Sequence, residues 1–176
     1  MGALPNPDGV PDIDQTLERL VAQFQIPLLR TCYMILRDRT LAEDAVQETF
    51  MKAYRNLGTF RGESSEKTWL MRIAMNTCRD MRRSSWFRHI NQTVTPDMLQ
   101  DVSAAGETDE EALINEVMRL PFALREVVLL YYYQNTDTNE IAEILGIARS
   151  SVSGRLQRAR QKLRAVLERM DSDEGY

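Results

Sequence analysis

One segment, residues 137–163, constrains the fold of this chain more than any other. Asp137, with Glu140 three residues later, forms a capping box that satisfies free N–H groups at the start of a helix. Gly146 lies where a tight turn needs a residue that tolerates a positive φ angle. Apolar residues recur at helical spacing in two stripes, first Ile141, Ala142, Leu145 and Ile147, then Val152, Leu156, Ala159 and Leu163. The segment therefore predicts a helix-turn-helix.

The second of these helices is strongly basic. No acidic residue interrupts its cations, which are Arg149, Arg155, Arg158, Arg160, Lys162 and Arg164. A helix with a buried apolar seam and a basic outer face suits a DNA groove lined with phosphates. The alternative is an ordinary solvated helix end, where cations favour the C-terminal dipole. Because the turn, the cap and the charge agree within one hairpin, the pattern favours DNA binding.

The formal net charge of -4 is opposite in sign to what DNA binding needs, but it is unevenly distributed. Residues 96–116 contain acidic residues and no basic one, whereas residues 72–88 and 149–169 are strongly basic. Net charge averages over regions that bind DNA and regions that avoid it.

Composition places the chain among soluble globular proteins, because 43% of its residues are hydrophobic and its mean hydropathy is -0.39. The longest apolar run, residues 127–133, is far shorter than the roughly 20 residues that span a bilayer. The acidic, proline-rich N-terminus lacks the features of a signal peptide. We therefore expect a cytoplasmic protein without membrane insertion. Cys32 and Cys78 lie within helical patterns and are predicted to be buried, reduced thiols.

Apolar periodicity predicts an all-α fold with two small helical domains, the C-terminal one containing the helix-turn-helix. Gly58 is predicted to end a helix as its C-cap. The stretch before the second domain is polar and acidic, a composition typical of a flexible linker. The predicted organisation is a disordered tail (1–11), a first domain (12–92), an acidic linker (93–111), a second domain (112–170) and a C-terminal tail (171–176).

The residues needed for catalysis are missing. The single histidine, His89, has no carboxylate pair or cysteine cluster beside it in the sequence, and a metal site needs several such ligands. There is no glycine-rich phosphate-binding motif either. We expect a protein that is not an enzyme and that has no metal or cofactor.

Three stretches, taken in order, resemble one family. They are residues 42–62 (AEDAVQETFMKAYRNLGTFRG), 67–83 (KTWLMRIAMNTCRDMRR) and 120–164 (LPFALREVVLLYYYQNTDTNEIAEILGIARSSVSGRLQRARQKLR). This combination resembles bacterial RNA polymerase sigma factors of the extracytoplasmic-function (ECF) group, which keep only the second and fourth sigma domains. The resemblance covers nearly everything from about residue 17 to residue 168. It implies a subunit that binds core RNA polymerase and directs promoter-specific initiation of transcription.

The resemblance also implies where the polymerase binds. Asp44, Gln47 and Glu48 lie on the polar face of an amphipathic helix and match the motif that contacts the clamp coiled coil of the largest polymerase subunit. For an ordinary helix, a solvated polar face would be sufficient explanation. Residues 120–134 resemble the segment that rests on the flap of the second-largest subunit. The acidic linker would thread toward the active-site channel.

A second basic segment suits single-stranded DNA, because it combines cations, aromatic rings and an amide. In the family, the loop before this helix receives a base flipped out of the −10 element, and the helix holds the unwound strand. Trp69, at helical spacing with Ile73, is predicted to belong to the core. The −10 residues implied are Phe60, Arg61, Glu63, Ser64, Ser65, Lys67, Arg72, Asn76, Arg79, Asp80 and Arg83.

The helix-turn-helix is implied to read the −35 element as duplex DNA. Ser151, Ser153, Gly154, Gln157 and Arg158 match positions near base edges, and Arg149, Arg155 and Arg160 match positions near phosphates. Glycine inside a helix costs about 1 kcal/mol relative to alanine. Gly154 therefore predicts a close approach of the backbone to DNA, with an ordinary small-residue contact as the alternative.

Two other functions remain open from the residues alone. A stand-alone helix-turn-helix regulator would use its N-terminal domain for dimerisation or effector binding, and would bind palindromic DNA without polymerase. A helical adaptor with no DNA role is disfavoured by the two basic segments. The family resemblance further implies an anti-sigma factor as a partner.

Overall fold

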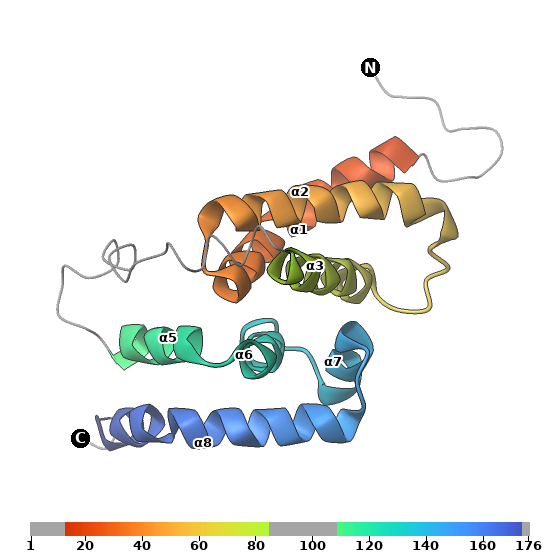
Figure 1. The fold of residues 1–176 in the computed structure, drawn as a ribbon. Helices are drawn as coiled ribbons and strands as arrows, with labels where there is room; N and C mark the ends of the chain where they lie inside the picture. The colour runs from red at the N-terminus through yellow and green to blue at the C-terminus, as the bar shows by residue number, and fades with distance from the viewer. Residues whose placement is uncertain (1–12, 85–108, 174–176) are drawn as a thin grey trace.

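The computed structural model describes residues 13–84 and 109–173, and within these ranges it is helical with no strand. The first lobe contains α1 (Ile13–Leu36), α2 (Arg39–Asn56), the short 3₁₀ turn η1 (Leu57–Thr59) and α3 (Glu66–Arg83). The second lobe contains α5 (Asp109–Arg119), α6 (Phe122–Val128), the π-helical turn η3 (Leu129–Tyr133), α7 (Thr138–Leu145) and α8 (Arg149–Asp173). Figure 1 shows α1–α3 on one side of the molecule and α5–α8 on the other. The predicted all-α fold is confirmed.

The predicted linker lies mostly outside the described residues, as do the N-terminal tail and the end of the first domain after residue 84. Helix α8 runs to Asp173, three residues into the predicted C-terminal tail. In the second lobe, α5 begins at Asp109, three residues before the predicted start of the second domain. No helix in the described ranges has both the length and the apolar character needed to cross a membrane.

Helices α2 and α3 of the first lobe begin at side-chain caps. Asp38 accepts a hydrogen bond from the Leu41 N–H at the start of α2, and Ser65 accepts one from the Thr68 N–H at the start of α3. The core between the three helices includes both cysteines, which are free and buried as predicted. A hydrogen bond with Cys32, together with burial, raises the pKa of the Cys78 thiol well above its usual value.

The predicted C-cap at Gly58 is wrong. Helix α2 ends at Asn56 with Leu57 as its cap, and Gly58 continues into the 3₁₀ turn without a positive φ angle. A 3₁₀ turn tightens the end of an α-helix and satisfies its last carbonyls without a left-handed residue. The left-handed glycine of this lobe is Gly62, in the loop that follows, with φ 72°.

The helix-turn-helix has the turn that its sequence predicts, and the Asp137 half of the predicted capping box forms. The Asp137 carboxylate accepts hydrogen bonds from the N–H groups of Asn139 and Glu140 at 2.7 and 3.1 Å, so it caps α7. Gly146 ends α7 in the left-handed conformation, with φ 63°. The second apolar stripe, Val152, Leu156, Ala159 and Leu163, is buried.

The two lobes are in contact with each other. Helix α3 packs against α7, α1 contacts α6, and the buried apolar side chains of both lobes form one connected core. This arrangement brings one face of α3 against the second lobe.

Candidate nucleic-acid interface

The predicted polymerase-binding residues lie on α2. The Asp44 and Gln47 side chains are exposed, and Glu48 is half-buried with its carboxylate 3.8 Å from the Lys52 ammonium. Beside Gln47, an apolar groove of about 680 Å³ runs between α1 and α2; it is lined by Leu17, Val21, Gln25, Leu29, Glu43, Val46, Gln47, Phe50, Met51, Tyr54 and Arg55. The groove and the polar residues together form a mixed surface of the kind that protein partners cover.

The predicted −10 loop forms a small polar pocket of about 320 Å³. Phe60 packs on Trp69 with the ring centroids 4.8 Å apart and an angle of 30° between the planes. Trp69 is only half-buried, so it contacts the core with one part and lines this pocket with another. The complete lining is Thr59, Phe60, Arg61, Glu63, Ser64, Trp69, Arg72 and, from the second lobe, Glu143.

The cations of α3 have two different environments. Arg83 is exposed to solvent, as are the polar residues Asn76 and Asp80 beside it on the helix. Three other cations instead bind acceptors on the second lobe. The Lys67 ammonium donates to the Gln134 carbonyl at 2.7 Å, and Arg72 pairs with the Glu143 carboxylate. The third, Arg79, binds the buried carboxylate of Glu126.

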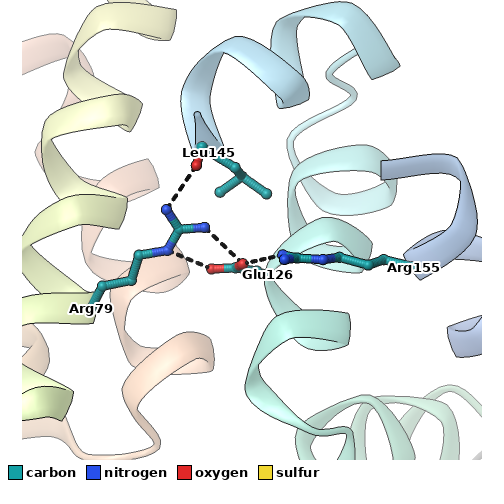
Figure 2. Close-up of polar contacts among 4 residues, drawn as sticks. All are labelled: Arg79, Glu126, Leu145 and Arg155. Carbon is teal, nitrogen blue, oxygen red and sulfur yellow. Dashed lines mark hydrogen bonds and ion pairs between the residues drawn. The ribbon is translucent and has the colours of Figure 1, made fainter. Parts of the chain in front are cut away.

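Arg79 meets a carboxylate that is shared with the recognition helix. Its guanidinium donates to both oxygens of Glu126, at 2.8 and 3.1 Å, and to the Leu145 carbonyl at 2.9 Å. Arg155 of α8 donates to the same carboxylate from the opposite side, at 2.9 Å (Figure 2). Glu126 is only 2% exposed, so one buried carboxylate binds an arginine from each predicted DNA-binding helix.

The outer face of α8 presents the residues that were predicted to lie near base edges. Ser151, Ser153, Gln157 and Arg158 are exposed, and the Arg158 Nε donates to the Gly154 carbonyl one turn earlier at 3.2 Å. A Cβ added at Gly154 would meet no heavy atom within 4 Å in the described part of the chain. The alternative of a small-residue contact within the protein is therefore not supported.

The three arginines predicted to bind phosphates differ in orientation. Arg149 is exposed and donates to the Thr138 hydroxyl at 3.3 Å. Arg160 donates to the Tyr132 hydroxyl at 2.7 Å, and this hydrogen bond raises the pKa of its guanidinium. Arg155 points inward to Glu126 instead of outward. Of the three, Arg155 is the one that must leave its partner before it could reach a phosphate.

The sequence patterns missed the residues of the second lobe that receive these cations. Glu126 and Arg125 interrupt an apolar run, and a charged pair at buried helical positions was the signal that could have revealed them. Arg125 is buried without a carboxylate partner among the described residues. It donates to the carbonyls of Met118 and Ile35 at 2.5 and 2.8 Å. Burial, with repulsion from Arg37 and Arg82, lowers the pKa of Arg125 to about 10.

Comparison with known proteins decides the family. Residues 20–88 match the family model for Sigma-70 region 2, and residues 110–163 match that for Sigma-70, region 4. The ECF RNA polymerase sigma factor SigW of Bacillus subtilis is 30% identical over 162 residues, which cover 84% of this chain and 87% of that protein. The chain belongs to the ECF group of sigma factors.

This ECF sigma factor is also similar to a probable RNA polymerase sigma factor, RfaY, of Xanthomonas campestris pv. campestris. The two are 28% identical over 94% of this chain, but the chain spans only 44% of that longer relative. Its fold resembles the sigma factor RpoE of Bartonella quintana, solved in complex with the anti-sigma factor NepR. That match has a TM-score of 0.69 at 22% identity and covers 88% of this chain and 98% of the other. Sigma factors are a family of non-catalytic transcription initiation factors, and the protein is one of them.

Proposed function

We propose that this sigma factor reads the −35 element as duplex DNA with α8 and captures the melted −10 element with the loop after α2 and the exposed part of α3. The observation that carries this proposal is that one chain has two different basic surfaces. One is a helix after a left-handed turn, and the other adjoins a pocket with a stacked aromatic pair.

The −35 assignment is supported by the exposed face of α8. Arg158 is spaced one turn from Gly154, so its side chain and the bare backbone of the glycine lie on the same side of the helix. An arginine can bind guanine bidentately and a glutamine such as Gln157 suits adenine, each with about 1–3 kcal/mol of discrimination. We assign base reading to the exposed residues Ser151, Ser153, Gln157 and Arg158, and phosphate contacts to Arg149 and Arg160.

The −10 assignment is supported by the pocket beside Phe60. Its aromatic pair offers a flat surface, and the polar side chains of Glu63 and Ser64 offer hydrogen-bonding groups. Flipping a base costs a few kcal/mol of unstacking, which stacking and backbone contacts can offset. The cations of α3 would hold the phosphates of the unwound strand.

The partners follow from the surfaces and the family. The exposed face at Asp44, Gln47 and Glu48 is proposed to bind the clamp coiled coil of core RNA polymerase, and the surface around α6 and η3 to bind the flap. An anti-sigma factor is a further proposed partner, because a sigma factor of similar fold was solved with one.

Size-exclusion co-elution with purified core RNA polymerase tests the polymerase assignment. The wild-type chain is expected to co-elute at sub-micromolar concentration, whereas Asp44→Lys with Glu48→Lys is expected to reduce co-elution without loss of helicity by far-UV circular dichroism. The matched control, Glu116→Lys with Glu168→Lys, makes the same charge change on the other lobe and should co-elute as wild type. Equal co-elution of all three proteins would refute the clamp assignment.

A further inference from the structure

The polar contacts between the lobes form a set that involves the proposed −10 face. On the first lobe the groups are Thr31, Lys67, Arg72 and Arg79, and on the second lobe Glu126, Gln134, Glu143 and the Leu145 carbonyl; we call this set the interlobe clasp. Three of its members are cations of α3, and each binds a carboxylate or carbonyl oxygen. Such oxygens are the protein groups that most resemble DNA phosphates as acceptors.

Glu126 links both DNA-binding helices within the clasp. Its Oε1 accepts from Arg79 at 2.8 Å and from Arg155 at 2.9 Å, and Figure 2 shows the two guanidinium groups approaching it from opposite sides. Because Glu126 and Arg155 belong to the same lobe, their ion pair can persist when the lobes separate. Arg79 would then lose its partner and become available to DNA.

Helix ends strengthen the contact. Arg79 donates to the Leu145 carbonyl at the C-terminus of α7, where the helix leaves its last carbonyls without partners. In the other direction, Arg125 of the second lobe donates to the Ile35 carbonyl near the C-terminus of α1. The negative end of a helix dipole favours a cation, so each lobe caps a helix of the other.

The clasp also contributes residues to the wall of the proposed −10 pocket. Glu143 of α7 lines this pocket and pairs with Arg72 at its wall. A flipped base entering the pocket would therefore meet a carboxylate of the second lobe beside the phosphate-binding cation. The same helix, α7, therefore pairs with the cation and forms part of the pocket wall.

We propose that the free chain closes on itself through the interlobe clasp, and that closure withholds α3 and its pocket from promoter DNA until the lobes separate. This inference rests on the proposed −10 role of α3. Opening breaks one buried ion pair, Arg79–Glu126, and one exposed pair, Arg72–Glu143, and such pairs contribute little net stability when both partners can be solvated. A partner that binds the open form better than the closed form shifts the population toward the open form.

Pulsed electron–electron double resonance on the full-length chain measures the distance between the lobes and so tests the closure. Spin labels go on Arg30→Cys in α1 and Gln161→Cys in α8, both exposed, whereas Cys32 and Cys78 are buried. The label pair is expected to give one narrow distance distribution. Glu143→Ala, which removes the partner of Arg72, should broaden and lengthen it. Thr31→Val should do the same, because it leaves the buried Gln134 amide without the acceptor that lies 2.7 Å away.

Glu116→Ala is the matched control, because it breaks an ion pair with Arg119 inside the second lobe only. It should leave the distribution narrow. A broad distribution in the parent protein, or a narrow one in both clasp variants, would overturn the proposal.

The same variants test whether closure withholds DNA. If nine in ten free molecules are closed, opening should tighten binding of a single-stranded −10 oligonucleotide about tenfold, and the difference should vanish in complex with core polymerase. Open variants that bind no more tightly would contradict the withholding. The failure of the proposed function would look different. In that case the chain would close as expected and gain affinity on opening, but it would never co-elute with polymerase.

Discussion

Helices α3 and α8 are both basic and both assigned to promoter DNA, but they differ in what their cations contact. On α3, Lys67, Arg72 and Arg79 bind acceptors of the other lobe. On α8, Arg155 points at a buried carboxylate of its own lobe, whereas Arg158 lies on the exposed face. Basic composition therefore indicates a DNA-binding helix but does not indicate whether its cations are free to contact DNA.

The largest expected effect is on stability, at the carboxylate that the two helices share. Glu126→Ala would leave two arginines without their buried counter-charge, a change that typically costs about 3–5 kcal/mol. Urea denaturation monitored by far-UV circular dichroism measures the loss of free energy of unfolding. The control Glu116→Ala, at a partly exposed pair, should change it by less than about 1 kcal/mol. A Glu126→Ala protein as stable as this control would show that the shared carboxylate is not a structural link.

The next largest effect concerns DNA binding by α8 alone. Arg158→Ala should reduce binding to a −35 duplex by about 1–3 kcal/mol, since a base contact is lost while the buried stripe of α8 is untouched. Fluorescence anisotropy with the polymerase complex measures this affinity, and co-elution with core polymerase should be unchanged. Loss of co-elution instead would mean that this face contacts protein and not DNA.

Replacing Gly154 should change stability and DNA binding in opposite directions. Gly154→Ala should stabilise the protein by about 1 kcal/mol, because alanine is the better helix former and its Cβ meets open space. If the backbone approaches DNA closely here, the same methyl group should weaken binding of the −35 duplex. Denaturation and anisotropy on the one variant separate the two effects. Greater stability with unchanged affinity would remove the reason we give for this glycine.

The smallest effect concerns a pair that fixes the start of α3. Arg19 donates to both oxygens of Glu66, and this hydrogen bonding lowers the pKa of Glu66. A carboxyl whose pKa is lower in the folded state stabilises the protein above its unfolded pKa, and that stabilisation is lost as pH falls through the folded value. Arg19→Ala should therefore be slightly less stable at pH 7, with the difference from wild type vanishing in acid. Thermal unfolding across pH tests this, and a constant difference would contradict it.

Local chemistry made much of this molecule predictable. The Asp137 cap, the left-handed Gly146 and the buried second stripe of the helix-turn-helix depend on residues a few positions apart, so their pattern alone was sufficient. Gly58 was misjudged because a 3₁₀ turn and a left-handed cap both tolerate glycine, and only the backbone distinguishes them.

The clasp was not predictable in the same way. Arg79 and Glu126 are 47 positions apart, and their pairing depends on how the two lobes face each other. Periodicity places a residue on one face of its own helix but does not identify the opposing element. For the same reason, Trp69 was expected in the core, although it also lines the pocket beside Phe60. The individual roles in DNA and polymerase binding remain predictions.

Transcription of fragmented genomic DNA by core RNA polymerase, with and without the chain, tests the central claim most directly. New transcript starts are expected that appear only with the chain and share one −35 and one −10 element at constant spacing. Arg158→Ala should lose these starts, whereas Glu116→Ala should keep them. Transcript starts that do not change when the chain is added would contradict the account.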